Sequence, residues 1–136
     1  MENTFAVAVR APFKEAVRLT KESLAARGFD ILSDSDFAAQ LGPDAPDWML
    51  GCRILGTCNT ALAGEAMKLD RAIGAAVPCN VVIREDPGGT VSVVEALNPG
   101  SLVDLAGQEQ LAQVVSRTSD GLQAALTTLR ESAGPA

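Results

Sequence analysis

Two runs rich in β-branched residues, at 81–84 and 91–97, flank the segment Asp86-Pro87-Gly88-Gly89. Proline and paired glycines favour a reversal of the chain, and apolar runs on both sides of such a turn are typical of a β-hairpin. The two strands of a hairpin are antiparallel, because a short connection cannot return the chain to a parallel start. The rest of the chain must therefore pack around an antiparallel unit.

The segments on either side of this hairpin alternate between strand and helix patterns. Alternating or continuous apolar runs predict strands at 4–10, 29–32 and 48–57. Apolar residues at spacings of three and four predict three helices: one from residue 13 that ends at Gly28, one that begins after Asn59, and one over 108–130. Ser35 or Asp36 is expected to cap a further short helix. This order lacks a regular βαβ rhythm, so it predicts a single α+β domain over residues 1–136, with a mostly antiparallel sheet and helices on one face.

The charge and residue content exclude several classes of function. The net charge is −6 and no run of Lys or Arg occurs, which argues against nucleic acid and against an anionic membrane as partners. The chain has no histidine, so Ser-His-Asp and Cys-His catalysis and histidine-bound zinc or haem are excluded within one chain. No signal peptide or long apolar segment is visible, which predicts a cytoplasmic protein with reduced thiols.

Two Cys-Asn pairs are the candidate functional motif. Cys58-Asn59 and Cys79-Asn80 each lie where an apolar run meets another element, in a chain with only three cysteines. Glu95 lies in an apolar run with the same parity as Val91 and Val93, and an inward carboxylate is costly unless it is paired. We expect a ligand-binding site at Cys58, Asn59, Cys79, Asn80 and Glu95. A closed tetrahedral zinc site is not expected, because the chain has no Cys-x-x-Cys motif and no histidine.

Each of these residues also has a simpler structural interpretation. Cys58 is either a thiol activated by the start of the following helix or a small buried side chain at a strand end. Cys79 either forms a redox or soft-metal pair with Cys58 or lies in a tight turn. Glu95 either points inward or keeps its head in water, with Arg53 and Arg84 as possible partners. Cys52 shares the parity of Cys58 about 20 Å away along a strand, too far for a disulfide, and is interpreted as core packing.

The motifs at 53–59, 77–83 and 89–91, followed by Ala96-Leu97-Asn98-Pro99, resemble a bacterial and archaeal family, "domain of unknown function 302". The resemblance covers about residues 4–130. It implies a curved antiparallel sheet with helices, like that of the TATA-binding-protein-like fold, and a homodimer. It implies no activity or cofactor. Cys52 stands where the family usually has an aromatic residue, and Thr60 where proline commonly follows Cys-Asn.

Three functions remain open at this stage. The first is a homodimeric binding or sensing module with a small-molecule or soft-metal ligand near the two Cys-Asn motifs. The second is a thiol redox or sulfur-transfer enzyme that uses Cys58 and Cys79. The third is a purely structural dimerisation module. The first is favoured, because two thiols and two asparagine amides are expected to converge there without the acid and base groups of common hydrolases.

Overall fold

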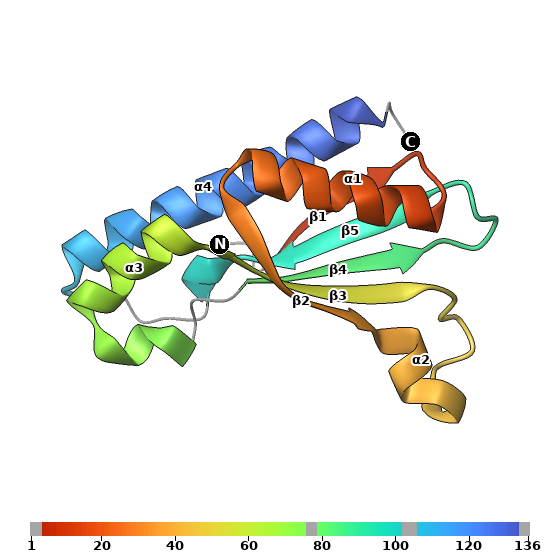
Figure 1. Ribbon diagram of the computed structural model, residues 1–136, viewed down its shortest axis with the longest axis horizontal. Coiled ribbons are helices and arrows are strands. Elements are labelled where there is room, and N and C mark those ends of the chain that lie inside the picture. Colours follow the sequence, from red (N-terminus) through yellow and green to blue (C-terminus); the bar gives the residue numbers. More distant parts are fainter. Residues whose placement is uncertain (1–3, 76–78, 102–105, 134–136) are drawn as a thin grey trace.

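The computed structural model describes residues 4–75, 79–101 and 106–133, and its elements follow the predicted mixture of strands and helices (Figure 1). The strands are β1 (Thr4–Val9), β2 (Phe29–Asp36), β3 (Cys52–Asn59), β4 (Cys79–Glu85) and β5 (Ser92–Leu97). The helices are α1 (Phe13–Ala26), α2 (Phe37–Leu41), α3 (Thr60–Leu69) and α4 (Glu109–Ser132), with short 3-10 turns at Gly42–Asp44, Arg71–Ala75 and Pro99–Ser101.

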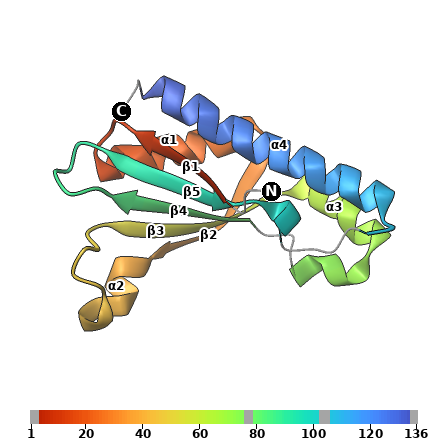
Figure 2. The same ribbon diagram turned by 180° about the vertical axis from the view of Figure 1, so that it is seen from behind.

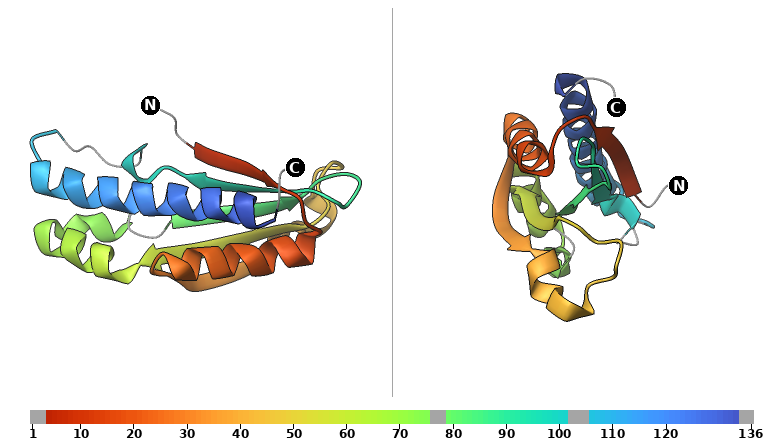
Figure 3. Two further views of the ribbon diagram at one scale, coloured as in Figure 1. Left: turned by 90° about the horizontal axis from the view of Figure 1, so that it is seen from above. Right: turned by 90° about the vertical axis from the view of Figure 1, so that its right-hand side faces the viewer.

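The strands form one five-stranded sheet in the order β1-β5-β4-β3-β2, and each neighbouring pair is antiparallel. The predicted hairpin, β4 and β5, lies inside the sheet, while β1 and β2 form its edges. The sheet is curved, as the views from behind and from the side show (Figures 2 and 3). The predicted α+β class with an antiparallel sheet is confirmed.

Helices α1 and α4 lie side by side on the same face of the sheet (Figures 1 and 3). Helix α1 packs against β2, β4 and β5, whereas α4 packs against β1. The Ser23 hydroxyl of α1 donates a 2.7 Å hydrogen bond to the carbonyl oxygen of Ala125 in α4. The core between helices and sheet includes Leu24, Leu122, Leu126, Leu55, Val81, Ile83 and Val94. Burial of this apolar layer supplies the main stabilising free energy of the fold.

Two helix starts are capped as the sequence indicates. The Asp36 carboxylate accepts a hydrogen bond from the backbone N–H of Ala39 at the start of α2. The Asn59 amide oxygen accepts one from the backbone N–H of Leu62 at the start of α3. Each cap satisfies a backbone donor that has no partner within the first helical turn.

The largest differences between the structure and the sequence prediction are at the end of β2 and the start of β3. Strand β2 extends to Asp36, although its second half is polar, because it pairs with β3 on both sides of a bulge at Leu32. Strand β3 begins at Cys52 rather than at residue 48, since the backbone N–H of Met49 turns back to the carbonyl oxygen of Pro46. Trp48 therefore lies in the preceding loop, with 62% of its surface exposed.

Gly121 provides a test of the packing between α4 and β2. A Cβ atom built at Gly121 would lie 3.3 Å from the Phe29 ring, which is buried, whereas one at Gly64 of α3 would meet nothing within 4 Å. We expect Gly121→Val to lower the free energy of unfolding by about 1–3 kcal/mol through overpacking. Gly64→Val is the matched control and should be neutral or slightly stabilising. Equal effects of the two variants in urea denaturation would contradict this account.

Asp34 provides a test of the polar contacts between α1 and the sheet. It accepts two 2.8 Å hydrogen bonds from Arg53, and its carboxylate lies 2.6 Å from the Lys21 ammonium. The Arg53 hydrogen bonds, followed by that of Lys21, lower the pKa of Asp34. The contribution of Asp34 to the free energy of unfolding is therefore present above its unfolded-state pKa, and it is lost as the pH falls through the lower folded-state pKa. We expect Asp34→Asn to destabilise the protein by about 1 kcal/mol at neutral pH.

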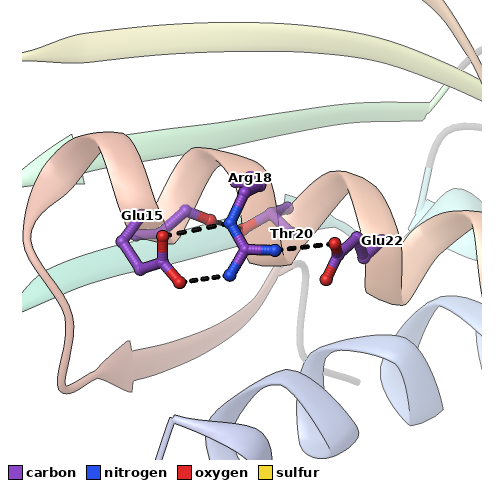
Figure 4. Close-up of polar contacts among 5 residues, drawn as sticks. Glu15, Arg18, Thr20 and Glu22 are labelled. Carbon is purple, nitrogen blue, oxygen red and sulfur yellow. Dashed lines mark hydrogen bonds and ion pairs between the residues drawn. The ribbon is translucent and has the colours of Figure 1, made fainter.

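The difference between wild type and Asp34→Asn should shrink as the pH of urea denaturation approaches 3. The control is Glu22→Gln, because Glu22 shares an exposed ion pair with Arg18 on the solvent side of α1 (Figure 4). Exposed pairs of this kind contribute little, so we expect no measurable change there. A constant difference for Asp34→Asn over the whole pH range would contradict the ion-pair explanation.

Candidate functional site

The register of the strands assigns every side chain of the sheet to one of two faces. Residues directly opposite each other in an antiparallel pair share a face, and neighbours along a strand alternate. Val94, Ile83 and Leu55 belong to the core under the helices. We call the other surface the open face, and it carries Ala6 and Ala8 of β1, Val93 and Glu95 of β5, Asn80, Val82 and Arg84 of β4, Cys52, Ile54 and Cys58 of β3, and Asp30, Ser33 and Ser35 of β2.

Neither of the long helices covers the open face. Figure 3 shows α1 and α4 together on the opposite side, with α2 at the β2 end of the sheet. Helix α2 contacts β3, and Cys52, at the start of that strand, is buried. Ile54, Val82 and Val93, in the middle of the open face, are only partly buried. The open face is therefore an accessible and partly apolar surface.

An ion pair between Arg84 and Glu95 lies within the open face. Its closest N–O distance is 3.5 Å, and both side chains keep about a third of their surface exposed, at 35% and 36%. Glu95 thus adopts the predicted arrangement in which its head remains in water, with Arg84 as its partner. Arg53, the other predicted partner, lies on the helix-covered face and bonds Asp34 instead.

Cys58 is the penultimate residue of β3 and lies on the open face, directly opposite Asp30 of β2. Its side chain is buried, and burial, followed by the nearby Asp30 carboxylate, raises the pKa of the Cys58 thiol. This direction is opposite to the one expected from the start of α3 alone. Desolvation and a negative neighbour both disfavour a thiolate.

Cys79 belongs to the core on the other face. It pairs with Thr57, the residue before Cys58, so the two cysteines lie on adjacent strands with their side chains on opposite faces. Burial, with a smaller contribution from Cys58, raises the pKa of the Cys79 thiol to about 11. Cys52, Cys58 and Cys79 are all buried, and none of them forms a disulfide.

The two asparagines also separate. The Asn59 side chain caps α3, whereas Asn80 is exposed on the open face, opposite Gly56. A Cβ at Gly56 would collide with the Ser33 hydroxyl, so glycine lets β2 and β3 approach closely at this point. Pro78, which precedes the second motif, lies outside the described residues. Of the five predicted site residues, Cys58, Asn80 and Glu95 share the open face. They do not form one cluster, because Cys58 is buried near the end of β3, whereas Glu95 lies opposite Val82 in the middle of the sheet.

A hollow that the sequence does not indicate lies between α3 and α4. Its volume is about 350 Å³, and its lining includes Leu69, Val114, Gln110 and Gln113. The Arg117 guanidinium donates a 2.8 Å hydrogen bond to the Glu65 carboxylate at this site. The sequences of α3 and α4 are each typical of an ordinary amphipathic helix, so the hollow becomes visible only when the two helices pack together.

The described residues contain no group of three or more His, Cys, Asp or Glu side chains placed to hold a metal ion. Over the same parts of the chain, no helix has both the length and the apolar character required to cross a membrane.

Comparison with known proteins identifies relatives by sequence and by fold. The model of the family described as domain of unknown function DUF302 matches residues 5–129. The crystal structure of an uncharacterized conserved DUF302 protein from Bacillus stearothermophilus matches with a TM-score of 0.84 and 22% sequence identity, over 96% of this chain and all of that one. At this identity the likeness establishes a shared fold. Among proteins with curated annotation, none matches.

The pH dependence of thiol alkylation tests the state of Cys58. Because its pKa is raised, we expect the rate of iodoacetamide modification to rise only above the ordinary thiol range near pH 8.5. Cys79 should react more slowly and at still higher pH. Peptide mapping by mass spectrometry separates the two sites, and urea-denatured protein is the control. Alkylation of Cys58 with a midpoint below about pH 7.5 would instead indicate an activated nucleophile.

Proposed function

This chain belongs to the family described as domain of unknown function DUF302, and we propose that it is a homodimeric, cytoplasmic binding or sensing module whose binding surface is the open face. One observation carries the proposal. Asn80 and Arg84 of β4 and Glu95 of β5 lie on the one face of the sheet that the long helices leave uncovered. Cys58 lies on the same face, but it is buried and is at the opposite end of β3 from the position that pairs with Arg84.

The composition of the open face favours a small ligand with an apolar body and a polar end. Ile54, Val82 and Val93 offer partly exposed apolar surface around the Arg84–Glu95 pair. Pockets and platforms for small molecules combine such apolar ground with a few convergent polar groups. Asn80 adds an amide that can both donate and accept hydrogen bonds.

The looseness of the Arg84–Glu95 contact supports a role in recognition. Its 3.5 Å distance exceeds the 2.8 Å between Arg53 and Asp34, and charge-assisted hydrogen bonds are usually about 2.7–2.9 Å long. Neither group is therefore held tightly by the other. Arg84 can turn to a carboxylate or phosphate of a ligand, and Glu95 to an amine.

The thiol-enzyme alternative has less support from the geometry. It needs a low-pKa Cys58 and a resolving thiol within reach, but the pKa values of both cysteines are raised and their side chains lie on opposite faces. The soft-metal ligand requires the same convergence of the two sulfurs. We therefore favour recognition by the charged and amide groups of the open face.

Native mass spectrometry of protein purified from cell extract without added ligand tests this function. We expect a dimer with extra mass that is lost on denaturation. The double variant Arg84→Ala/Glu95→Ala should lose most of that mass, since it removes both charges and leaves neither unpaired. The control is Arg18→Ala/Glu22→Ala, which also removes one positive and one negative charge, here from the exposed Glu15–Arg18–Glu22 cluster on α1 (Figure 4).

Three outcomes would contradict the proposal. The same extra mass in the open-face variant would place the ligand elsewhere. A bare wild-type dimer with reduced thiols would favour the purely structural dimerisation module. A bare dimer in which each chain is lighter by one disulfide would favour the thiol redox alternative.

A further inference from the structure

The outer edge of β1 has the features of a strand that can pair with another strand. β1 pairs with β5 on one side, and no strand among the described residues pairs with it on the other. Thr4–Val9 contains no charged residue and no proline, and its register with β5 is continuous. A flat edge without charge, proline or bulge is a template for further pairing through its backbone N–H and C=O groups.

The opposite edge, β2, is protected against such pairing. A bulge interrupts its register between Ile31 and Ser33, and the extra residue, Leu32, is 57% exposed. Asp30, Asp34 and Asp36 add negative charge along the strand. Bulges and charged side chains are common ways in which proteins block an edge. The β1 edge of this sheet is therefore open to pairing with another strand, whereas the β2 edge is protected against it.

Burial on the helix-covered side of β1 is incomplete toward the start of the strand. Phe5, Val7 and Val9 all project to that side, but only Val9 is fully buried, whereas Phe5 and Val7 are half-buried at the edge of the core. An added strand would cover the apolar surface of both residues. Figure 3 shows that β1 forms the outer margin of the sheet beside α4.

We infer that β1 pairs antiparallel with β1 of a second copy, with Ala6 opposite the partner's Ala6. A strand that pairs antiparallel with its own copy forms an isologous contact, which closes at two subunits. Directly opposite residues of an antiparallel pair lie on the same face of the sheet. In a symmetric pair of β1 strands, one residue must therefore lie opposite its own copy, and the two-fold axis passes between these two residues. The inference rests on the proposed homodimer and identifies its interface.

The burial pattern selects the register centred on Ala6. This register places Phe5 opposite the partner's Val7 in both halves of the interface, so each half-buried side chain covers another. A register centred on Val7 would instead place Phe5 opposite the partner's Val9, which is already fully buried within its own subunit. The Ala6 register therefore buries more new apolar surface, and burial of that surface stabilises association.

Charge also favours a second copy at this edge. Each chain carries a net charge of −6, so two copies repel each other over most of their surfaces. β1 is uncharged and offers backbone hydrogen bonds where the chains approach most closely. Because the two-fold axis is perpendicular to the sheet, both open faces remain on the same side of a ten-stranded sheet and neither is covered.

Charge substitution at Ala6, measured by size-exclusion chromatography with light scattering, tests this interface. In Ala6→Lys or Ala6→Glu, two like charges would lie directly opposite across the axis, and we expect the dimer to dissociate about tenfold more readily. An equimolar mixture of the two variants should recover the dimer as a Lys–Glu heterodimer, which native mass spectrometry distinguishes by mass. Leu32→Lys and Leu32→Glu on the β2 edge are the matched controls and should remain dimeric.

The outcomes separate this inference from the proposed function. If both Ala6 variants dimerise as tightly as the wild type, the β1 interface is wrong, but the homodimer itself is not contradicted. A monomeric wild type at about 100 µM would overturn the homodimer itself, while binding by the open face would still be tested by the bound mass. Loss of the dimer without recovery in the mixture would overturn the Ala6 register. Recovery of the heterodimer also shows that both variants fold, and circular dichroism of each provides an independent check.

Discussion

One-sided burial of the sheet is the constraint on which the rest of this structure depends. Helices α1 and α4 cover one face, and their contact is reinforced by the hydrogen bond from Ser23 to Ala125. In the central strands, the side chains on this face are therefore mostly apolar and fit this layer, whereas toward β2 the same face also carries the Arg53–Asp34 pair. The remaining side chains of each strand point away from the helices and need not be apolar. An ion pair, an amide and an aspartate can therefore occupy the open face without destabilising the core.

Local patterns predict most elements because their causes are local. The Asp86–Gly89 turn, the caps at Asp36 and Asn59, and the end of α1 near Gly28 all depend on residues within a few positions of each other. Gly28 adopts a positive φ of 82°, which glycine adopts without strain. The polar half of β2 was missed because its strand conformation comes from pairing with β3, and nothing in Ser33–Asp36 alone indicates a strand.

The candidate site was predictable only in part. Strand parity correctly relates Cys52 to Cys58, and the choice of Arg84 as a partner for Glu95 follows from two adjacent strands of a hairpin. Parity alone does not show which face the helices cover, because that depends on contacts between distant segments. For the same reason, the burial that raises the pKa of Cys58 was not visible beside the local signal of a helix start. The two Cys-Asn motifs look equivalent in the sequence, yet their residues have four different environments.

The contrast between the two sheet edges also limits how far the protein can assemble. If both edges were flat and uncharged, each added copy would expose a new edge and the sheet could grow into a filament. The bulge at Leu32 and the aspartates of β2 remove one of the two growth points. An assembly that uses β1 therefore ends with a guarded strand on each outer margin, so the polar sequence of β2 protects the folded protein against open-ended polymerisation.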